Sequence, residues 1–157
     1  MTGAVQLRTC LWFDTGGIDA ARFYTTLLPD SIVETEAAPG ENPLIVNFTL
    51  AGVPYQIIST GPTYTASPAA SIAVMTEDQA EADRLWAALT ADGGSESRCG
   101  WLTDRWGVSW QIYPQELIAL LNAPDLQAAA RAQQAMLQMT KIEIAEVRRA
   151  FGGDTPA

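Results

Sequence analysis

Hydrophobic and polar residues alternate in several short stretches of the chain, which is the pattern of strands with one buried face. Within residues 5–13, two sets of positions fall on opposite faces: Leu7, Thr9, Leu11 and Phe13 on one, and Arg8, Cys10 and Trp12 on the other. Similar β-rich runs predict further strands at residues 32–37, 44–50, 53–59, 70–75, 95–100, 101–103 and 108–113. The chain therefore contains enough strands for two small sheets.

Apolar residues at helical spacing predict one helix after the first strand of each group. These helices span residues 18–28 and 76–91, and the acidic residues Glu77 and Asp78 suit the positive N-terminal end of the second. Three further helices are predicted at residues 116–122, 126–139 and 140–151. In the 126–139 helix an apolar stripe must pack against another surface; it comprises Ala132, Ala135, Met136 and Met139.

The stretch CGWLTDRWGVSWQIYP, residues 99–114, predicts a β-hairpin. Asp104 and Gly107 fit the first and fourth positions of a type I turn, with Arg105 expected as a solvated charge. Trp106 in this turn is expected to be exposed in a monomer, whereas Trp86 and Trp110 are expected in the core.

The second strand of this hairpin repeats an earlier sequence. GVSWQI at 107–112 matches GVPYQI at 52–57, and ARFY at 21–24 occupies the helix position that DRLW at 83–86 occupies in the second half. Two matching elements in the same order favour a duplicated strand–helix–three-strand unit. The predicted fold is α+β: two βαβββ modules at residues 1–60 and 69–114, a linker at 61–68, and a C-terminal helical extension at 115–157.

This order, with GVSWQI closing the second half, resembles the vicinal oxygen chelate superfamily of glyoxalase I, extradiol dioxygenases and fosfomycin and bleomycin resistance proteins. The stretches CLWFDTGGIDAARFYTTLLPDS, DRLWAAL and CGWLTDRWGVSWQIYP, with the tail AMLQMTKIEI, are similar to the PhnB-like branch. Members of that branch are often labelled 3-demethylubiquinone-9 3-methyltransferase. The resemblance covers residues 5–145.

The resemblance implies two modules whose sheets curve around a shared cleft. In metal-dependent members, the first strand of each module supplies a histidine to this cleft and the last strand a glutamate. The glutamate positions fall at Gln56 and Gln111, and the histidine positions fall near Arg8 or Cys10 and at Ser71. An amide oxygen is a weak, uncharged ligand, and Arg8 would repel a cation. We therefore expect no metal site and no cofactor.

On the same resemblance, one set of residues is expected to line the ligand-binding cleft: Arg8, Cys10, Trp12, Gln56, Ile58, Ser71, Gln111 and Tyr113. Two interpretations of the paired glutamines remain open. They either close the cleft by bonding to each other or to neighbouring backbone, or hold a polar ligand. Cys10 is expected to be a buried, inert thiol, and no catalytic residue is identified.

Composition narrows the function classes further. The 157 residues are 48% hydrophobic and 17% charged, which predicts a packed core. A net charge of −9 argues against nucleic acid and anionic membranes as partners. The absence of histidine removes Ser-His and Cys-His nucleophile pairs.

No apolar run reaches eighteen residues, and the N-terminus does not resemble a secretory signal. The two cysteines, Cys10 and Cys99, are expected to be reduced, so we predict a cytoplasmic protein. The Met-rich tail favours a homodimer.

Three functions remain open from the sequence. The first is a metal-free cleft that binds a small hydrophobic or aromatic molecule. The second is a metal-independent enzyme in which Arg8 acts as an electrostatic clamp. The third is a structural or interaction dimer with a closed cleft. A methyltransferase would need a Gly-rich loop for its cofactor, and Thr15-Gly16-Gly17 lacks that pattern.

Overall fold

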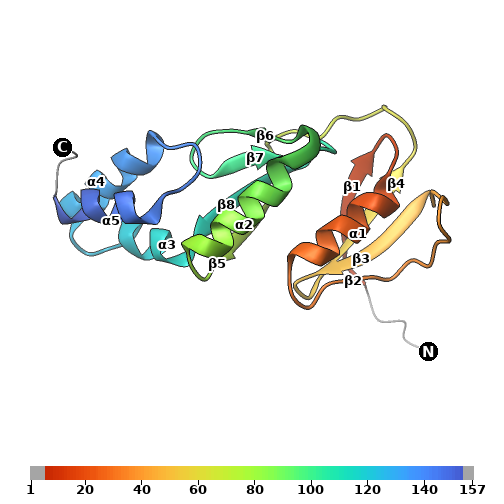
Figure 1. The fold of residues 1–157 in the computed structure, drawn as a ribbon, viewed down its shortest axis with the longest axis horizontal. Helices are drawn as coiled ribbons and strands as arrows, with labels where there is room; N and C mark the ends of the chain where they lie inside the picture. The colour runs from red at the N-terminus through yellow and green to blue at the C-terminus, as the bar shows by residue number, and fades with distance from the viewer. Residues whose placement is uncertain (1–5, 154–157) are drawn as a thin grey trace. The chain divides into compact units, whose positions relative to one another are not determined.

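The computed structural model describes residues 6–153 and divides the chain into two compact units, Met1–Ala66 and Ser67–Ala157. Each unit contains a four-stranded sheet with a helix packed on one face (Figure 1). The first unit contains β1 Thr9–Phe13, α1 Gly17–Leu27, β2 Ile32–Val33, β3 Ile45–Leu50 and β4 Val53–Ser59. The second contains β5 Ser71–Thr76, α2 Gln79–Thr90, η1 Ala91–Gly93, β6 Ser95–Glu96, β7 Trp101–Thr103, β8 Ser109–Pro114, α3 Gln115–Leu121, α4 Leu126–Leu137 and α5 Ile144–Gly152.

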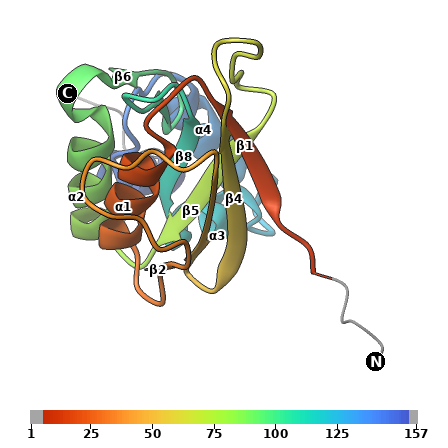
Figure 2. The same ribbon diagram turned by 90° about the vertical axis from the view of Figure 1, so that its right-hand side faces the viewer.

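The two sheets share one topology. Their strand orders are β1-β4-β3-β2 and β5-β8-β7-β6. In each sheet the strand that comes first along the chain pairs in parallel with the one that comes last, β1 with β4 and β5 with β8. The other neighbouring strands are antiparallel. Figure 2 shows β1 beside β4 in the first unit. The α+β fold with two βαβββ modules and a helical extension is thus confirmed.

One face of each sheet is buried beneath its helix. In the first unit the apolar positions of alternate residues fill this face: Phe13, Val46, Phe48, Leu50 and Ile57. In the second unit Ile72, Leu102, Trp110 and Ile112 do the same, and Trp86 of α2 is also buried. The alternation in the sequence therefore separated the buried faces from the open ones correctly, and the expectation that Trp86 and Trp110 lie in the core is confirmed.

Several element boundaries differ from the sequence-based prediction. The strand expected at 32–37 ends at Val33, because the amides of Glu34 and Thr35 both donate to the carbonyl of Asn47, at 2.9 and 3.2 Å. Two residues opposite one form a β-bulge, which interrupts the ladder. The helix expected at 76–91 begins at Gln79, because the side chain of Asp78 accepts from the amide of Glu81 and caps it.

The expected strand at 95–100 is also shorter, since only Ser95–Glu96 pair with β7. Cys99 and Gly100 adopt positive φ angles, and their amides donate to the carbonyls of Met139 and Thr140, each at 2.8 Å. A Cβ atom on Gly100 would lie 2.8 Å from the carbonyl oxygen of Ile112, so glycine is required at this crossing.

The helical extension shares a core with the second unit. Its fully buried cluster contains Leu117, Ala132, Ile142, Ile144 and Val147, and Met136 and Met139 pack against it. The helix expected at 140–151 starts at Ile144 instead, because the preceding residues bond to the rest of the unit. The stripe predicted for residues 126–139 therefore packs largely within the chain, and Met136 and Met139 no longer argue for a homodimer.

Asp104 is more than a turn former. The type I turn is present, with the amide of Gly107 donating to the carbonyl of Asp104 at 2.9 Å. The carboxylate of Asp104 is buried and accepts from the Trp106 and Val108 amides and the Trp110 indole, at 2.9, 3.0 and 2.8 Å. It holds the hairpin loop onto the core.

The expectation of a solvated Arg105 and an exposed Trp106 is wrong. The Arg105 guanidinium forms an ion pair with Asp92 at 2.7 Å and lies 5.2 Å from the centre of the Trp106 ring, which is half-buried. Both side chains therefore belong to the packed edge of this unit.

Candidate binding surfaces on the open sheet faces

The open face of the first sheet has an apolar end. Trp12, Ile58 and Ile45 lie side by side on β1, β4 and β3. Ile45 is 44% exposed, and the Trp12 ring makes an edge-to-face contact with Tyr64, with ring centres 4.8 Å apart. The indole N–H of Trp12 is already used, because it donates to the carbonyl of Gly61 at 2.9 Å. This end offers aromatic and aliphatic surface to a ligand.

The neighbouring row across the sheet is polar and contains Cys10, Gln56 and Asn47. Gln56 donates from Nε2 to Oδ1 of Asn47 at 2.9 Å. Cys10 is exposed, so the expectation of a buried thiol is wrong. Partial desolvation by its neighbours nevertheless raises the pKa of Cys10, which keeps the thiol protonated and a weak nucleophile at neutral pH.

Arg8 is committed to a side-chain network beside this face. Its guanidinium donates to both carboxylate oxygens of Glu34, at 3.1 and 2.6 Å, and to the carbonyl of Tyr55 at 3.2 Å. Thr49 adds a hydrogen bond to Glu34 at 2.7 Å. The hydrogen bonds from Arg8, then Thr49, lower the pKa of Glu34. The positive charge of Arg8 is therefore already paired with Glu34, whereas the hypothesis of a metal-independent enzyme needs that charge to hold a ligand.

On the second sheet, Gln111 donates from Nε2 to Oγ of Ser71 at 2.8 Å. Gln111 lies between Ala73 on β5 and Trp101 on β7. Tyr113 packs against the core of the helical extension instead of standing alone on the open face. The sequence-predicted residues thus form two groups, one on each sheet.

The strand registers settle which residues correspond between the modules. Gln56 is opposite Cys10, and Gln111 is opposite Ala73. Ser71, on β5, and Arg8, immediately before β1, each lie two residues before these positions. Of the two candidates for the first-strand position, Arg8 therefore corresponds to Ser71.

Each glutamine bonds to a side chain on its own sheet, Gln56 to Asn47 and Gln111 to Ser71. These partners do not fit the metal ion of the metal-dependent superfamily members, because amide, hydroxyl and guanidinium groups bring no anionic donor. Within residues 6–153, no three His, Cys, Asp or Glu side chains gather closely enough to hold a metal.

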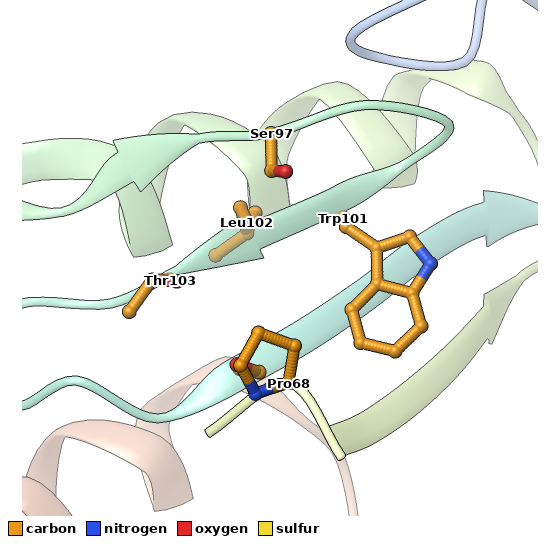
Figure 3. Close-up of a pocket in the computed structure, with 6 residues that line it drawn as sticks. Pro68, Ser97, Trp101, Leu102 and Thr103 are labelled. Atoms are coloured by element: carbon orange, nitrogen blue, oxygen red, sulfur yellow. The ribbon is translucent and has the colours of Figure 1, made fainter. Parts of the chain in front are cut away.

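Sequence reasoning missed a cavity of about 320 Å³ on the second unit. Its lining residues come from β7, β8 and two loops: Pro68, Ser97, Trp101, Leu102, Thr103 and Ser109. Figure 3 shows the side chain of Trp101 leaving β7 on the side where Pro68 lies. The available signal was the alternation in β7, which directs Trp101 and Thr103 to the open face.

Among the described residues, no helix is both long and apolar enough to cross a bilayer.

The comparisons with known proteins agree on one family. The family model described as 3-demethylubiquinone-9 3-methyltransferase matches residues 5–113, which end just before the helical extension. The PhnB protein from Bacillus cereus, which carries the same methyltransferase label, is 28% identical. Its structure has a TM-score of 0.60, and the alignment covers 69% of this chain and 99% of that one. No curated protein sequence matches.

Two further solved structures share the fold. A protein from Pseudomonas aeruginosa is 23% identical over 71% of this chain and 98% of its own, with a TM-score of 0.56. A glyoxalase-related enzyme from Fulvimarina pelagi is 15% identical over 72% of this chain and 91% of its own, with a TM-score of 0.50. With the family match and the duplicated βαβββ topology, the chain belongs to the PhnB-like 3-demethylubiquinone-9 3-methyltransferase family, which has the glyoxalase/bleomycin resistance fold.

Proposed function

We propose that this protein binds a small hydrophobic or aromatic molecule without a metal ion, on the open faces of its sheets. The observation that carries the proposal is the state of the four first- and last-strand positions. Gln56 and Gln111 bond to neighbouring side chains, as do Ser71 and Arg8. Satisfied polar groups beside exposed apolar ones suit ligand binding better than metal catalysis.

The proposed contact residues are those predicted from the sequence to line the cleft. On the first sheet Trp12 and Ile58 supply apolar surface, with Gln56, Cys10 and Arg8 as polar neighbours. On the second sheet the corresponding residues are Ser71, Gln111 and Tyr113. Apolar surface with a few polar groups is the usual composition of a small-molecule site.

Methyl transfer, the activity in the family's name, is not part of the proposal. Gly17, which opens α1, has a packing role, because a Cβ there would lie 2.5 Å from Oγ of Ser59 and 2.6 Å from Cγ2 of Ile57. Gly17 lets the helix approach β4 closely, so the glycine is explained without a nucleotide-like cofactor.

We also propose a homodimer in the cytoplasm. Support for the dimer now comes from exposed apolar residues of the first unit, Ile32 at 62% and Leu44 at 57%. Free thiols at Cys10 and Cys99 suit a reducing compartment. Light scattering coupled to size exclusion would give twice the 16.9 kDa chain mass for the dimer.

The binding proposal is tested on the full chain, purified without added metal. We expect elemental analysis to find no stoichiometric Zn, Ni, Fe or Mn, and neutral aromatic compounds to raise the melting temperature where these metal ions do not. Trp12→Leu should weaken binding, whereas Thr25→Val, on the outer surface of α1, should not. Stoichiometric metal that survives dialysis would overturn the proposal.

A further inference from the structure

The cavity beside Trp101 has the size and the lining of a site for a small organic ligand. Its volume of about 320 Å³ lies at the lower end of the range for ligand pockets. No charged side chain belongs to the residues that line it. Placing an ion there would cost desolvation energy without an opposite charge to offset it, so the lining favours a neutral molecule.

The polar groups of the lining are hydroxyls. Ser97, Thr103 and Ser109 each contribute one, and within residues 6–153 none of these hydroxyls takes part in a described side-chain hydrogen bond. Ser109 is only 3% exposed, and Thr103 is opposite it in the β7–β8 pair. The Ser109 Oγ is not a buried atom that lacks a partner; it belongs to the cavity lining, where the acceptor atom of a ligand can bond to it.

The aromatic wall is specific to the second unit. Asn47 is opposite Gln56 in the first sheet, and Trp101 is opposite Gln111 at the corresponding position of the second. Asn47 accepts the hydrogen bond of Gln56, whereas Gln111 turns to Ser71. The side-chain amide of Gln111 therefore bonds to β5, and the half-exposed Trp101 lies beside Pro68 (Figure 3).

We propose that this cavity is the ring-binding pocket of the protein and takes a neutral, planar aromatic molecule that carries a hydrogen-bond acceptor. The ring stacks against Trp101 and Pro68, and the acceptor bonds to the hydroxyls of Thr103 and Ser109. This inference rests on the proposed function and names the chemical class of its ligand. It adds Trp101, Thr103, Ser109 and Pro68 to the residues that bind.

The probe is quinoline, a neutral two-ring molecule with an acceptor nitrogen, titrated into the ¹⁵N-labelled full chain and followed by NMR. Shifts should concentrate on the Trp101 indole N–H and on the Thr103 and Ser109 amides. Trp101→Leu should weaken quinoline binding about tenfold, and Thr103→Val about threefold. Indole, which lacks the acceptor, and cyclohexanol, which lacks the plane, should bind more weakly than quinoline.

Two matched controls keep the test specific. Trp106→Leu makes the same change in the same hairpin outside the cavity, and Thr25→Val removes a hydroxyl on α1; both should leave quinoline affinity unchanged. If quinoline binds but its shifts fall on Trp12 and Gln56, with Trp101→Leu unaffected, the pocket assignment is overturned and the proposed function stands. If none of the three probes binds at millimolar concentration, the pocket assignment is also overturned. The elemental analysis and the melting temperatures described above then test the proposed function separately.

Discussion

Gln111 and Ser71 are joined by a hydrogen bond of 2.8 Å between neighbouring strands. They are the two positions where the resemblance to metal-dependent superfamily members predicts a glutamate and a histidine. The strand register already brings the two side chains together. What separates this surface from a partial metal site is therefore the chemistry of the donors and not their placement.

Changing both donors should create metal affinity. We expect Ser71→His combined with Gln111→Glu to bind Zn²⁺ at least about tenfold more tightly than either single variant, because an imidazole and a carboxylate would then share one ion. Isothermal titration calorimetry on the full-length variants measures this, with circular dichroism to check folding. Equal affinity in the double and single variants would mean that the side chains do not converge.

Asp104 should be among the most sensitive positions for stability. Asp104→Asn replaces one of two accepting oxygens by a donor amide, which then faces the indole N–H or the loop amides. We expect a loss of about 2 kcal/mol in the free energy of unfolding. Urea denaturation followed by tryptophan fluorescence measures the loss.

The matched control is Asp92→Asn, in the same edge of the unit. Asp92 also pairs with a neighbour, Arg105, but its side chain is 72% exposed. Exposed pairs contribute little, so the control should change the stability by less than about 1 kcal/mol. Similar losses in both variants would contradict a special role for Asp104.

The sequence predicted most of the fold because local pattern carries it. Alternation along a strand with one buried face determines which side chains point inward, and the GVSWQI and GVPYQI repeat revealed the duplicated module. The open-face positions of Trp12, Gln56 and Gln111 follow from that alternation alone.

Two of the errors, those at the methionines and at the cavity, come from contact between residues distant in sequence. Cys10 was expected to be buried because it sits in a predicted strand, although the face it occupies is open. Met136 and Met139 seemed to need a partner chain, but both pack against the cluster that contains Ile142. The cavity beside Trp101 joins Pro68 to β7 and β8, which no short window of sequence contains.

Gln79 is the clearest of these distant contacts and supplies a third prediction. Its Nε2 donates to the carbonyl of Ile142 at 2.9 Å, and its Oε1 accepts from the amide of Ile144 at 2.8 Å. Gln79→Leu would leave both backbone groups unsatisfied, so we expect a loss of about 2 kcal/mol in stability and faster proteolysis near residue 142. Gln115→Leu, which removes a longer hydrogen bond of 3.3 Å to Glu77, is the control and should lose less. Unchanged proteolysis in Gln79→Leu would show that apolar packing alone holds the extension.

The ion pair of Arg8 and Glu34 should make stability depend on pH in a defined direction. The pKa of Glu34 is lowered from 4.5, chiefly by its hydrogen bond from Arg8, so the folded state favours the ionised carboxylate. The pair therefore contributes stability above pH 4.5, and this contribution is lost as the pH falls through the lowered pKa.

A double-mutant cycle of Arg8→Gln and Glu34→Gln, measured by urea denaturation at several pH values, isolates the coupling between the two side chains. We expect a favourable coupling at neutral pH that declines toward zero between about pH 5 and about pH 3. A coupling that stays constant over that range would show that the two groups do not form an ion pair in solution, and would free Arg8 for the ligand-clamping role that the structure argues against.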